Sequence, residues 1–462
     1  MSIFHLDLNT YQQDFKTSQV NKERYGDVRT DFALVNKILD LLPQSRFENP
    51  RLKWLDPCAG TGYFTIILYK RLFKSLQTVI KNPMKRHRHI VRNMIWMIEI
   101  NGEHLDGLFQ LFGENANILN GNFLDMRSME FDTIIGNPPF NCNGIKKVPT
   151  NSSRNKKLDG RTVWVDFVTY SMMNLKNGGY LAMITPSIWM KRDHYHSNSL
   201  QKWNIKKIHC LTNTQTNRIF HKQAQTPTCY FTIVKEKTAL SSRVALFDSF
   251  LKNYINFSAN RQSGSVSFPL YGASIIEKLA DVVKQFGFIQ VTKTSIRPGY
   301  KGLTVKSASD ENHVYPNVST CVLNKLRPTL VVNFSNQKCV FAGVPKLILA
   351  HKMYGFPFYD STGEYGISNR DNYVIVGRTH NDFLRLKRFL STKLAFVAFE
   401  STRYRMKYLE RYAFEFLPDI TKIPNFPETI TDETVMDYFK FSELERKCID
   451  NIVKKQYKQF QE

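Results

Sequence analysis

The sequence predicts an α/β fold for the first half of the chain, with a mostly parallel sheet that helices cover on both faces. Two observations support this fold class. Short apolar runs such as KWLD and FDTIIG are typical of buried strands, and segments with apolar residues at helical spacing lie between them. Strands that alternate with helices form parallel sheets, because each connecting helix packs on the sheet. Ligands of such sheets bind beyond the carboxyl ends of the strands.

Helices and strands are expected in a regular order along this half. The first helix is expected at 31–42, where Val35, Ile38 and Leu39 share one face. A strand at 53–57 and a second helix at 63–76 follow it. Later strands are expected at 96–100, 131–136, 178–186 and 229–235.

The length of 462 residues suits two domains, each large enough to bury a hydrophobic core. The alternation of strands and helices fades after about residue 237, and Gly and Ser punctuate the segments that follow. We therefore expect a first domain at 1–245 and a second, smaller domain of mixed α/β type at 246–462.

The chain is strongly basic, with 64 Lys and Arg against 40 Asp and Glu and a formal net charge of +24. Such an excess predicts a polyanionic partner, with nucleic acid ahead of an anionic membrane surface. A solvated basic surface without a partner is the alternative. The basic run KNPMKRHRHIVR contains no acid, and it either contacts phosphate or is a solvated insertion.

Apolar runs are too short to cross a bilayer, and the N-terminal segment lacks a hydrophobic signal core. The seven cysteines are scattered and none has CxxC spacing. This pattern favours free thiols in a reducing, cytoplasmic compartment over disulfides or a zinc site. We expect no metal and no membrane partner.

A glycine turn follows the first predicted strand, in LDPCAGTGYF. The strand ends at Asp56, and Gly60 and Gly62 precede the next helix. Glycines at such a turn allow a ligand to approach the backbone closely. A GxG sequence alone is weak support, because plain β-turns contain it too, but its place between a strand and a helix favours a ligand site.

Polar residues and a ring lie farther along the chain. Glu99 ends the second strand, where an acid commonly binds ribose hydroxyls in nucleoside-binding sheets. An exposed strand-end acid is the alternative. Asn122, Phe123 and Asp125 come next, in ILNGNFLDM, and an acceptor beside a ring beyond a strand suits an adenine.

The segment FDTIIGNPPF places two prolines directly after a buried strand. Pro138 and Pro139 remove backbone donors and stiffen the turn. The side-chain oxygen of Asn137 and the carbonyl of Pro138 are then fixed acceptors, and Phe140 offers a flat face for a base. Two acceptors aimed at one amino group favour positive charge on its nitrogen, so the turn suits an amine nucleophile on a planar base. A rigid loop around a buried Phe140 is the alternative.

Together these motifs resemble those of S-adenosylmethionine-dependent N6-adenine DNA methyltransferases of the restriction–modification type. The order is the gamma order, in which cofactor motifs precede NPPF and a target-recognition domain follows. The resemblance covers most of 20–235. It implies a seven-stranded, mostly parallel, Rossmann-like methyltransferase sheet in a catalytic domain at 1–245, and a target-recognition DNA-binding domain at 246–462.

The resemblance also implies roles for the cofactor residues. Thr30, in YGDVRTDF, would meet the methionine carboxylate of S-adenosylmethionine, although the family often has Thr-Pro where this chain has Thr-Asp. Glu99 would bind the ribose. Asn122 stands where the family has an aspartate that accepts from the adenine, and Asp125 is a second candidate. The implied cofactor residues are Thr30, Asp56, Pro57, Gly60, Gly62, Phe64, Glu99, Asn122, Phe123 and Asp125.

The target base would be held by the NPPF turn. The implied catalytic residues are Asn137, Pro138, Pro139 and Phe140, with Phe220 stacked on the other face of the flipped adenine. Transfer would be direct, so no cysteine nucleophile is needed. Cys58 and Cys142 are expected to be packing residues.

The partner implied by the resemblance is double-stranded DNA, bound by a monomer. Arg403, Arg405, Lys407 and Arg411, in STRYRMKYLER, are candidate DNA contacts, with solvated helix charges as the alternative. An RNA adenine methyltransferase shares the catalytic turn and is the second enzyme candidate. A protein glutamine methyltransferase usually has Tyr in place of Phe140. A non-catalytic DNA-binding protein on the same fold is the candidate from another class.

Overall fold

The computed structural model describes most of the chain. The described residues are 2–8, 11, 19–26, 28–127, 129–142, 161–221, 224, 226–262, 264–296, 299–324, 327–351, 356–404 and 408–453. The chain divides into two compact units. The first comprises Met1–Phe247 and Ser258–Val266, and the second comprises Asp248–Phe257 and Ser267–Glu462.

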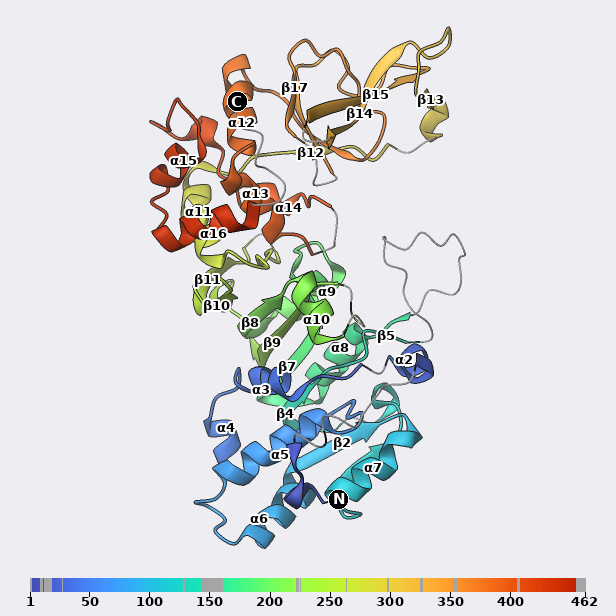
Figure 1. Ribbon diagram of the computed structural model, residues 1–462, viewed down its shortest axis with the longest axis vertical. Coiled ribbons are helices and arrows are strands. Elements are labelled where there is room, and N and C mark those ends of the chain that lie inside the picture. Colours follow the sequence, from blue (N-terminus) through green and yellow to red (C-terminus); the bar gives the residue numbers. More distant parts are fainter. Residues whose placement is uncertain are drawn as a thin grey trace. The chain divides into compact units, whose positions relative to one another are not determined.

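A nine-stranded sheet has the strand order β11-β10-β8-β9-β7-β4-β1-β2-β3 (Figure 1). Its strands belong to the first unit, except that Asp248 of β10 and residues 253–257 of β11 are counted in the second. The described pairs are parallel except those of β9, which is antiparallel to both β7 and β8. The strands are β1 (Trp54–Asp56), β2 (Ile95–Glu99), β3 (Asn117–Asn120), β4 (Phe131–Gly136), β7 (Leu175–Pro186), β8 (Trp203–Leu211), β9 (Thr228–Lys237), β10 (Ser241–Asp248) and β11 (Asn253–Asn260).

The predicted α/β class and the mostly parallel sheet are confirmed, but the expected number of seven strands is wrong. Two further strands, β10 and β11, extend the sheet beyond β8. Both alternate exposed and buried residues, as strands with one solvated face do. Such a pattern is a weaker sequence signal than the continuous apolar runs of β1 and β4.

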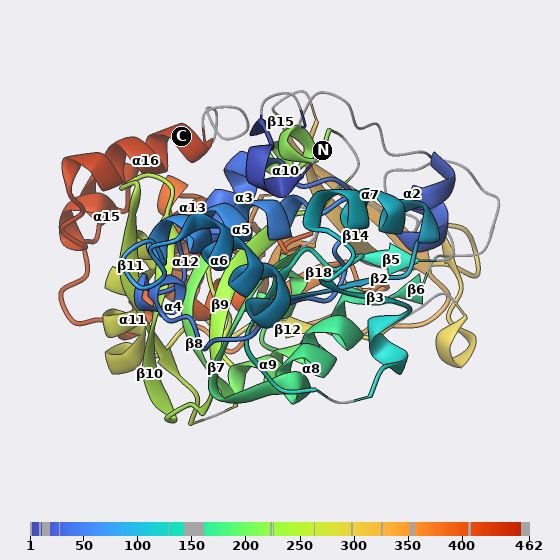
Figure 2. The ribbon, with the colours of Figure 1, turned by 90° about the horizontal axis from the view of Figure 1, so that it is seen from below.

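Helices cover both faces of this sheet. Figure 2 shows α3, α5 and α7 on one face and α8 and α9 on the other. The helices of the first unit are α2 (Gln19–Tyr25), α3 (Phe32–Leu39), α4 (Ser45–Glu48), α5 (Tyr63–Ser75), α6 (Pro83–His89), α7 (Gly102–Phe112), α8 (Trp164–Asn174), α9 (Tyr195–Gln201) and α10 (Asn213–Ile219). Short helical turns lie at Ile3–His5, Ile90–Met94, Phe123–Asp125 and Ser187–Met190, and a two-stranded ribbon joins β5 (Asn141–Cys142) to β6 (Arg161–Thr162).

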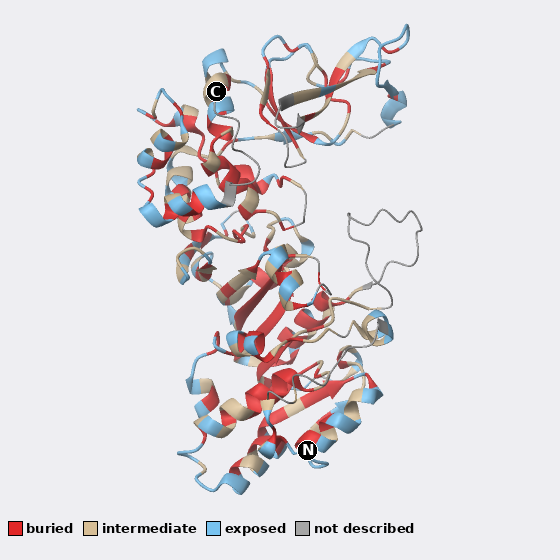
Figure 3. Cartoon of the chain, viewed as in Figure 1, coloured by how far each residue is buried: buried red, intermediate tan, exposed pale blue. Residues whose placement is uncertain are grey.

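The helix faces that the sequence predicts to be apolar are buried (Figure 3). Val35, Ile38 and Leu39 of α3 are fully buried, and so is Leu72 of α5. Asp31 caps α3 by accepting a hydrogen bond from Leu34 N at 2.7 Å. A cap of this kind fixes where the helix begins, and it therefore fixes the segment that leads into it.

The basic run at 81–92 forms α6 and the turn that follows it. Arg86 is buried, donates to the Ile80 carbonyl at 2.8 Å and lies 4.1 Å from the ring centre of Phe73. Arg86 is therefore a packing residue of this basic run, while Lys81, Lys85 and Arg88 are exposed.

β1 lies between β2 and β4, and this arrangement positions the site. Asp56 pairs in register with Met97 of β2, and Leu55 pairs with Ile134 of β4. All three strands are parallel, so their carboxyl ends meet at one edge of the sheet. Pro57, Gly60, Glu99 and Asn137, which are among the predicted site residues, lie at or just beyond the carboxyl ends of these three strands.

Helices and antiparallel strands both occur in the second unit. Its helices are α11 (Ala273–Phe286), α12 (His380–Leu390), α13 (Lys393–Ser401), α14 (Tyr412–Glu415), α15 (Asp432–Tyr438) and α16 (Glu443–Val453), with turns at Tyr300–Gly302 and Ile420–Lys422. Its strands are β12 (Thr292–Lys293), β13 (Val305–Lys306), β14 (Tyr315–Asn324), β15 (Arg327–Ser335), β16 (Lys346–Ala350), β17 (Phe358–Asp360) and β18 (Asn372–Ile375). They form a sheet in the order β12-β18-β16-β17 and another in the order β13-β15-β14.

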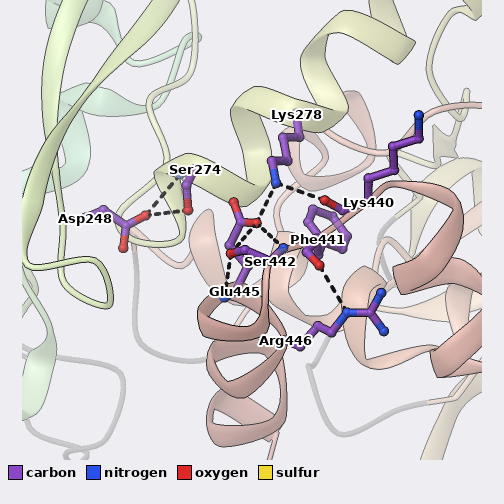
Figure 4. Close-up of polar contacts among 8 residues, drawn as sticks. All are labelled: Asp248, Ser274, Lys278, Lys440, Phe441, Ser442, Glu445 and Arg446. Atoms are coloured by element: carbon purple, nitrogen blue, oxygen red, sulfur yellow. Dashed lines mark hydrogen bonds and ion pairs between the residues drawn. The ribbon is translucent and has the colours of Figure 1, made fainter.

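A buried carboxylate fastens α16 to α11 in the second unit (Figure 4). Glu445 accepts from Lys278 Nζ at 2.6 Å and from Ser442 N at 2.8 Å. Lys278 also donates to the Lys440 carbonyl at 3.1 Å. Because the carboxylate is 4% exposed and has several donors, it helps to fix the end of the described chain.

Candidate functional site

A cavity of about 580 Å³ lies in the first unit at the carboxyl ends of β1, β2, β3 and β4. Its size is typical of cofactor sites. The predicted site residues that line it are Thr30, Pro57, Gly60, Phe64, Glu99, Asn122, Phe123, Asn137 and Pro139. Asp56, Gly62, Asp125, Pro138, Phe140 and Phe220 are not among its lining residues.

The glycine turn predicted from sequence connects β1 to α5. Gly60 and Gly62 have φ angles of +54° and +88°, which favour glycine. Gly60 N donates to Glu99 Oε2 at 2.6 Å, so the turn is tied to the end of β2. Gly62 is the N-cap of α5 and makes no side-chain cap, so the first turn of the helix offers backbone donors beside the cavity.

Glu99 has both structural and ligand-binding capacity. It is 6% exposed, and its other oxygen accepts from Asn101 N at 2.7 Å. A carboxylate has about four acceptor positions. Glu99 can therefore hold the glycine turn with some of them and ligand hydroxyls with others.

Asp56 lies behind the turn, away from the cavity. It is 2% exposed and accepts from Cys58 N at 3.3 Å and from Thr65 Oγ1 at 3.2 Å. Burial raises the pKa of its carboxyl to about 7, partly offset by those two hydrogen bonds. Its hydrogen bonds to Cys58 and Thr65, on either side of the glycines, indicate a residue that stabilises the conformation of the turn.

Residues after β3 form another wall of the cavity. Phe123 is buried against Phe167 and Tyr170, with ring centres 5.7 Å and 5.0 Å away. Asn122 Oδ1 accepts from Leu124 N at 3.2 Å, and its Nδ2 donates to Asp125 Oδ2 at 2.8 Å. Asn122 Oδ1 retains a second lone pair for a ligand amino group.

Asn137 is oriented by the segment ahead of α3. Its Nδ2 donates to Thr30 Oγ1 at 2.9 Å and to the Val28 carbonyl at 3.4 Å. Its Oδ1 is buried and, among the described residues, has no hydrogen-bond partner. An unpaired buried acceptor costs stability, so one beside a cavity indicates a site for a ligand donor.

Phe140 and Phe220 are brought together from distant parts of the sequence. Their ring centres lie 6.3 Å apart and their planes are inclined by 73°. Phe220 is 1% exposed, and the Phe140 carbonyl accepts from Val163 N at 3.2 Å. The two rings meet edge to face, and the stacking of Phe220 on a target base stays a prediction.

Cys58 is packed beside the turn that holds Asn137. Its thiol donates to the Asn137 carbonyl at 3.3 Å. Burial and the nearby Asp56 carboxyl hold the pKa of the thiol well above its ordinary value. A nucleophilic cysteine needs a lowered pKa, so this thiol is poorly suited to attack.

The predicted DNA contacts of the second unit have different surroundings. Arg403 donates to both carboxylate oxygens of Glu400, at 2.7 Å and 2.8 Å. Arg411 is exposed and lies 5.3 Å from the ring centre of Tyr412. Arg405 and Lys407 lie outside the described residues.

Sequence reasoning missed Asn101, which lines the cavity next to Glu99. Its Oδ1 caps α7 by accepting from Glu103 N at 3.2 Å. Its Nδ2 is buried and unpaired within the described part of the chain. Ile100, Val163 and Phe167 also line the cavity. An Asn two residues after a strand-end acid was the available signal for Asn101, but it also fits a simple helix cap.

The cavity fits the S-adenosylmethionine that the sequence motifs imply. Glu99 offers acceptors for hydroxyls, and Phe123 and Ile100 offer apolar surface for a base. Asn101 and Asn137 both line this cavity, and Asn101 Nδ2 and Asn137 Oδ1 have no hydrogen-bond partner in the described part of the chain. Within the described ranges no cluster of three or more His, Cys, Asp or Glu could hold a metal ion, and none of the described helices is long and apolar enough to span a membrane.

Comparisons with known proteins point in the same direction. Residues 60–220 match the family described as Eco57I restriction-modification methylase. An uncharacterized adenine-specific methylase of Mycoplasma pneumoniae is 24% identical, and the match covers 36% of this chain and 56% of that protein. The chain thus spans little more than half of this relative's length.

Two solved structures are similar to the chain. The type IIG restriction endonuclease BpuSI has a TM-score of 0.44 and 12% identity, over 95% of this chain and 67% of that one. A modification subunit of a putative type I restriction enzyme from Vibrio vulnificus YJ016 has a TM-score of 0.38 and 16% identity, over 52% and 50%. With the family match and the methylase relative, the resemblance of this chain to adenine methyltransferases of restriction–modification systems is confirmed.

Proposed function

We propose that the protein transfers the methyl group of S-adenosylmethionine to the N6 amino group of a flipped-out adenine in double-stranded DNA. The observation that carries this proposal is the buried Asn137 Oδ1, an acceptor without a partner among the described residues. An adenine amino group is a donor that would satisfy it. The resemblance to adenine methyltransferases supports the same substrate.

The residues around the cavity would hold the cofactor, which supplies an electrophilic methyl group when bound. Glu99 would accept from the ribose hydroxyls, and Phe123 would pack on the adenine of the cofactor. Thr30 would donate to the carboxylate. Asn122 and Asp125 are the proposed acceptors for the amino group of the cofactor's adenine. The backbone of the glycine turn would lie close to the bound cofactor.

The catalytic turn would act by position and electrostatics. Asn137 Oδ1 and the Pro138 carbonyl would accept both hydrogens of the target amino group and fix its nitrogen lone pair toward the methyl carbon. Positive charge would develop on that nitrogen as its bond to the methyl carbon forms and the carbon–sulfur bond breaks, and the two acceptors would stabilise this charge. S-adenosylhomocysteine would be the leaving group, and the nitrogen would then lose one proton to solvent. Phe140 would stack on the base, which must leave the helix to reach the cavity.

The second unit is proposed to recognise the target sequence, and Arg403, Arg405, Lys407 and Arg411 remain candidate DNA contacts. We propose further that the enzyme acts as a monomer in a reducing cytoplasmic compartment. The net charge of +24 supports a polyanionic substrate. Lys and Arg side chains that contact phosphates release the counterions of the duplex, and this release favours binding.

Methyl transfer from labelled S-adenosylmethionine to a mixture of duplex DNA and RNA tests the proposal directly. We expect label in DNA, and nucleoside digestion should identify it as N6-methyladenine. Label in RNA alone would replace the proposal with an RNA methyltransferase. Absence of label from both, with the cofactor bound, would contradict methyl transfer to nucleic acid by this chain.

A further inference from the structure

Asn137 has a single amide orientation that its surroundings explain. A carbonyl oxygen can only accept, so the Val28 carbonyl, 3.4 Å away, requires Nδ2 and not Oδ1 on its side. Thr30 Oγ1, at 2.9 Å, accepts from the same nitrogen. Both amide hydrogens are thereby directed to the segment ahead of α3, and Oδ1 faces away from that segment as the remaining acceptor.

Thr30 is held firmly enough to act as a reference point. It is 4% exposed, and the next residue, Asp31, caps α3. A hydroxyl accepts and donates at once, so Thr30 can accept from Asn137 and still donate its own proton to a ligand in the cavity that it lines. One hydroxyl can therefore contact both the cofactor side and the target-base side of the site.

Gly26 allows the segment to lie this close to the catalytic turn. Its φ angle of +71° favours glycine. A Cβ atom at this position would stand 2.8 Å from Pro139 Cβ and would collide with the Asn141 carbonyl oxygen. A larger residue at position 26 would separate the two segments and lengthen the Asn137–Thr30 hydrogen bond.

We infer that Gly26, Val28 and Thr30 orient the catalytic amide, and that Thr30 is a positioning residue that couples cofactor binding to acceptance of the target base. This inference rests on the proposed methyl transfer. When Thr30 donates to the carboxylate of the cofactor, its oxygen becomes a better acceptor, because hydrogen bonds in a chain strengthen one another. Asn137 is then held with Oδ1 toward the base. Without the Thr30 hydroxyl only the longer hydrogen bond to the Val28 carbonyl, at 3.4 Å, holds the amide among the described residues, so Oδ1 is less firmly directed toward the amino group.

The test compares Thr30→Val and Thr30→Ser with the wild type. The control is Thr232→Val, which removes a buried hydroxyl that has no hydrogen-bond partner among the described residues. Thr30→Val should lower kcat about a hundredfold, as expected for a misplaced catalytic group. Thr30→Ser should remain within about threefold of the wild type, since it keeps the hydroxyl. Thr232→Val should leave kcat unchanged.

A binding measurement separates positioning from simple cofactor contact. The affinity for a duplex that carries the target site, found by sequencing methylated product, is measured with and without S-adenosylhomocysteine. In the wild type and in Thr30→Ser, S-adenosylhomocysteine should increase the affinity for the duplex. In Thr30→Val that coupling should disappear, because coupling between two ligands requires a shared element.

Gly26→Ala provides a second test, with Gly107→Ala as its control because a Cβ at Gly107 meets no atom within 4 Å. Gly26→Ala should lower kcat at least tenfold with S-adenosylhomocysteine affinity largely retained. Two results would overturn the inference while methyl transfer stands: an unchanged kcat in Thr30→Val, or coupling that survives in it. A wild-type protein that binds the cofactor and methylates no nucleic acid would instead contradict the proposed function.

Discussion

Among the single residues that line the cavity, some polar groups have hydrogen-bond partners within the described protein and others do not. Glu99 and Asn122 each bind backbone or side-chain donors of the protein itself. Asn101 Nδ2 and Asn137 Oδ1 have no partner within the described part of the chain. Unpaired buried groups cost free energy of folding, and both lie where a ligand would pair with them.

Asn101→Ser tests whether the unpaired donor binds the cofactor. Serine is as good an N-cap as asparagine, so α7 should keep its cap and the unfolding free energy should change by less than about 0.5 kcal/mol. The affinity for S-adenosylhomocysteine should fall about tenfold, the value of one lost hydrogen bond. Calorimetric titration measures it, and equal affinities of variant and wild type would remove Asn101 from the site.

The buried Asp56 carboxyl should make stability depend on pH. Its pKa of about 7 in the folded protein lies above the ordinary value of about 3.9 in the unfolded chain. The folded state therefore binds more protons between those values, and stability should fall as the pH rises through them, by up to about 1.4 kcal/mol per pH unit.

Asp56→Asn removes that titration. Relative to the wild type, the variant should gain unfolding free energy steadily between pH 5 and pH 7, as measured by urea unfolding at several pH values. Parallel stability curves of the two proteins over this range would show that Asp56 does not titrate there.

At the scale of elements, continuous apolar runs were the reliable sequence signal. They predicted β1, β2, β4, β7 and β9, and the 3.6-residue pattern predicted α3 and α5. β10 was missed, and the predicted domain boundary at residue 245 falls within its span, Ser241–Asp248. Alternating strands without a long apolar run leave no comparable signal, because their burial depends on neighbours distant in sequence.

The site was predictable in part for the same reason. Local motifs identified the strand-end residues, since topology alone brings the ends of parallel strands together. The hydrogen bond from Asn137 to Thr30 joins residues 107 positions apart. No local pattern encodes that contact, and the edge-to-face arrangement of Phe140 and Phe220 is likewise a product of tertiary packing.

A buried ion pair stabilises the sheet of β16 and β17 in the second unit. Lys346 is 0% exposed and donates to Asp360 at 2.5 Å and to the carbonyls of Phe341 and Val344. Lys346→Met would leave the Asp360 carboxylate buried without its cation, which should cost about 3–5 kcal/mol of unfolding free energy.

Lys447→Met is the matched control for Lys346→Met, because Lys447 forms an exposed pair with Glu443. Its effect on unfolding free energy should stay below about 1 kcal/mol. Denaturant titration of both variants makes the comparison. A Lys346 variant as stable as the control would show that the pair contributes specificity and little stability.

At the scale of the whole molecule, the charge of +24 and the two units suit a protein that binds duplex DNA. Nonspecific binding should depend strongly on salt, because each phosphate contact releases counterions. With several such contacts, affinity for a random duplex should fall by on the order of a thousandfold between about 50 mM and about 200 mM salt. Fluorescence anisotropy over that range measures how affinity changes with salt concentration. An affinity that does not depend on salt would show that the net positive charge does not contribute to DNA binding.

Asn137→Ala removes Oδ1, the proposed acceptor for the target amino group. We would measure single-turnover methyl transfer to duplex DNA together with the dissociation constant for S-adenosylhomocysteine in the variant and the wild type. Transfer should slow at least about a hundredfold, as is typical when one charge-stabilising group is removed, and cofactor affinity should change less than about threefold. Transfer at the wild-type rate, or a loss explained entirely by weaker cofactor binding, would contradict the proposed role of Oδ1.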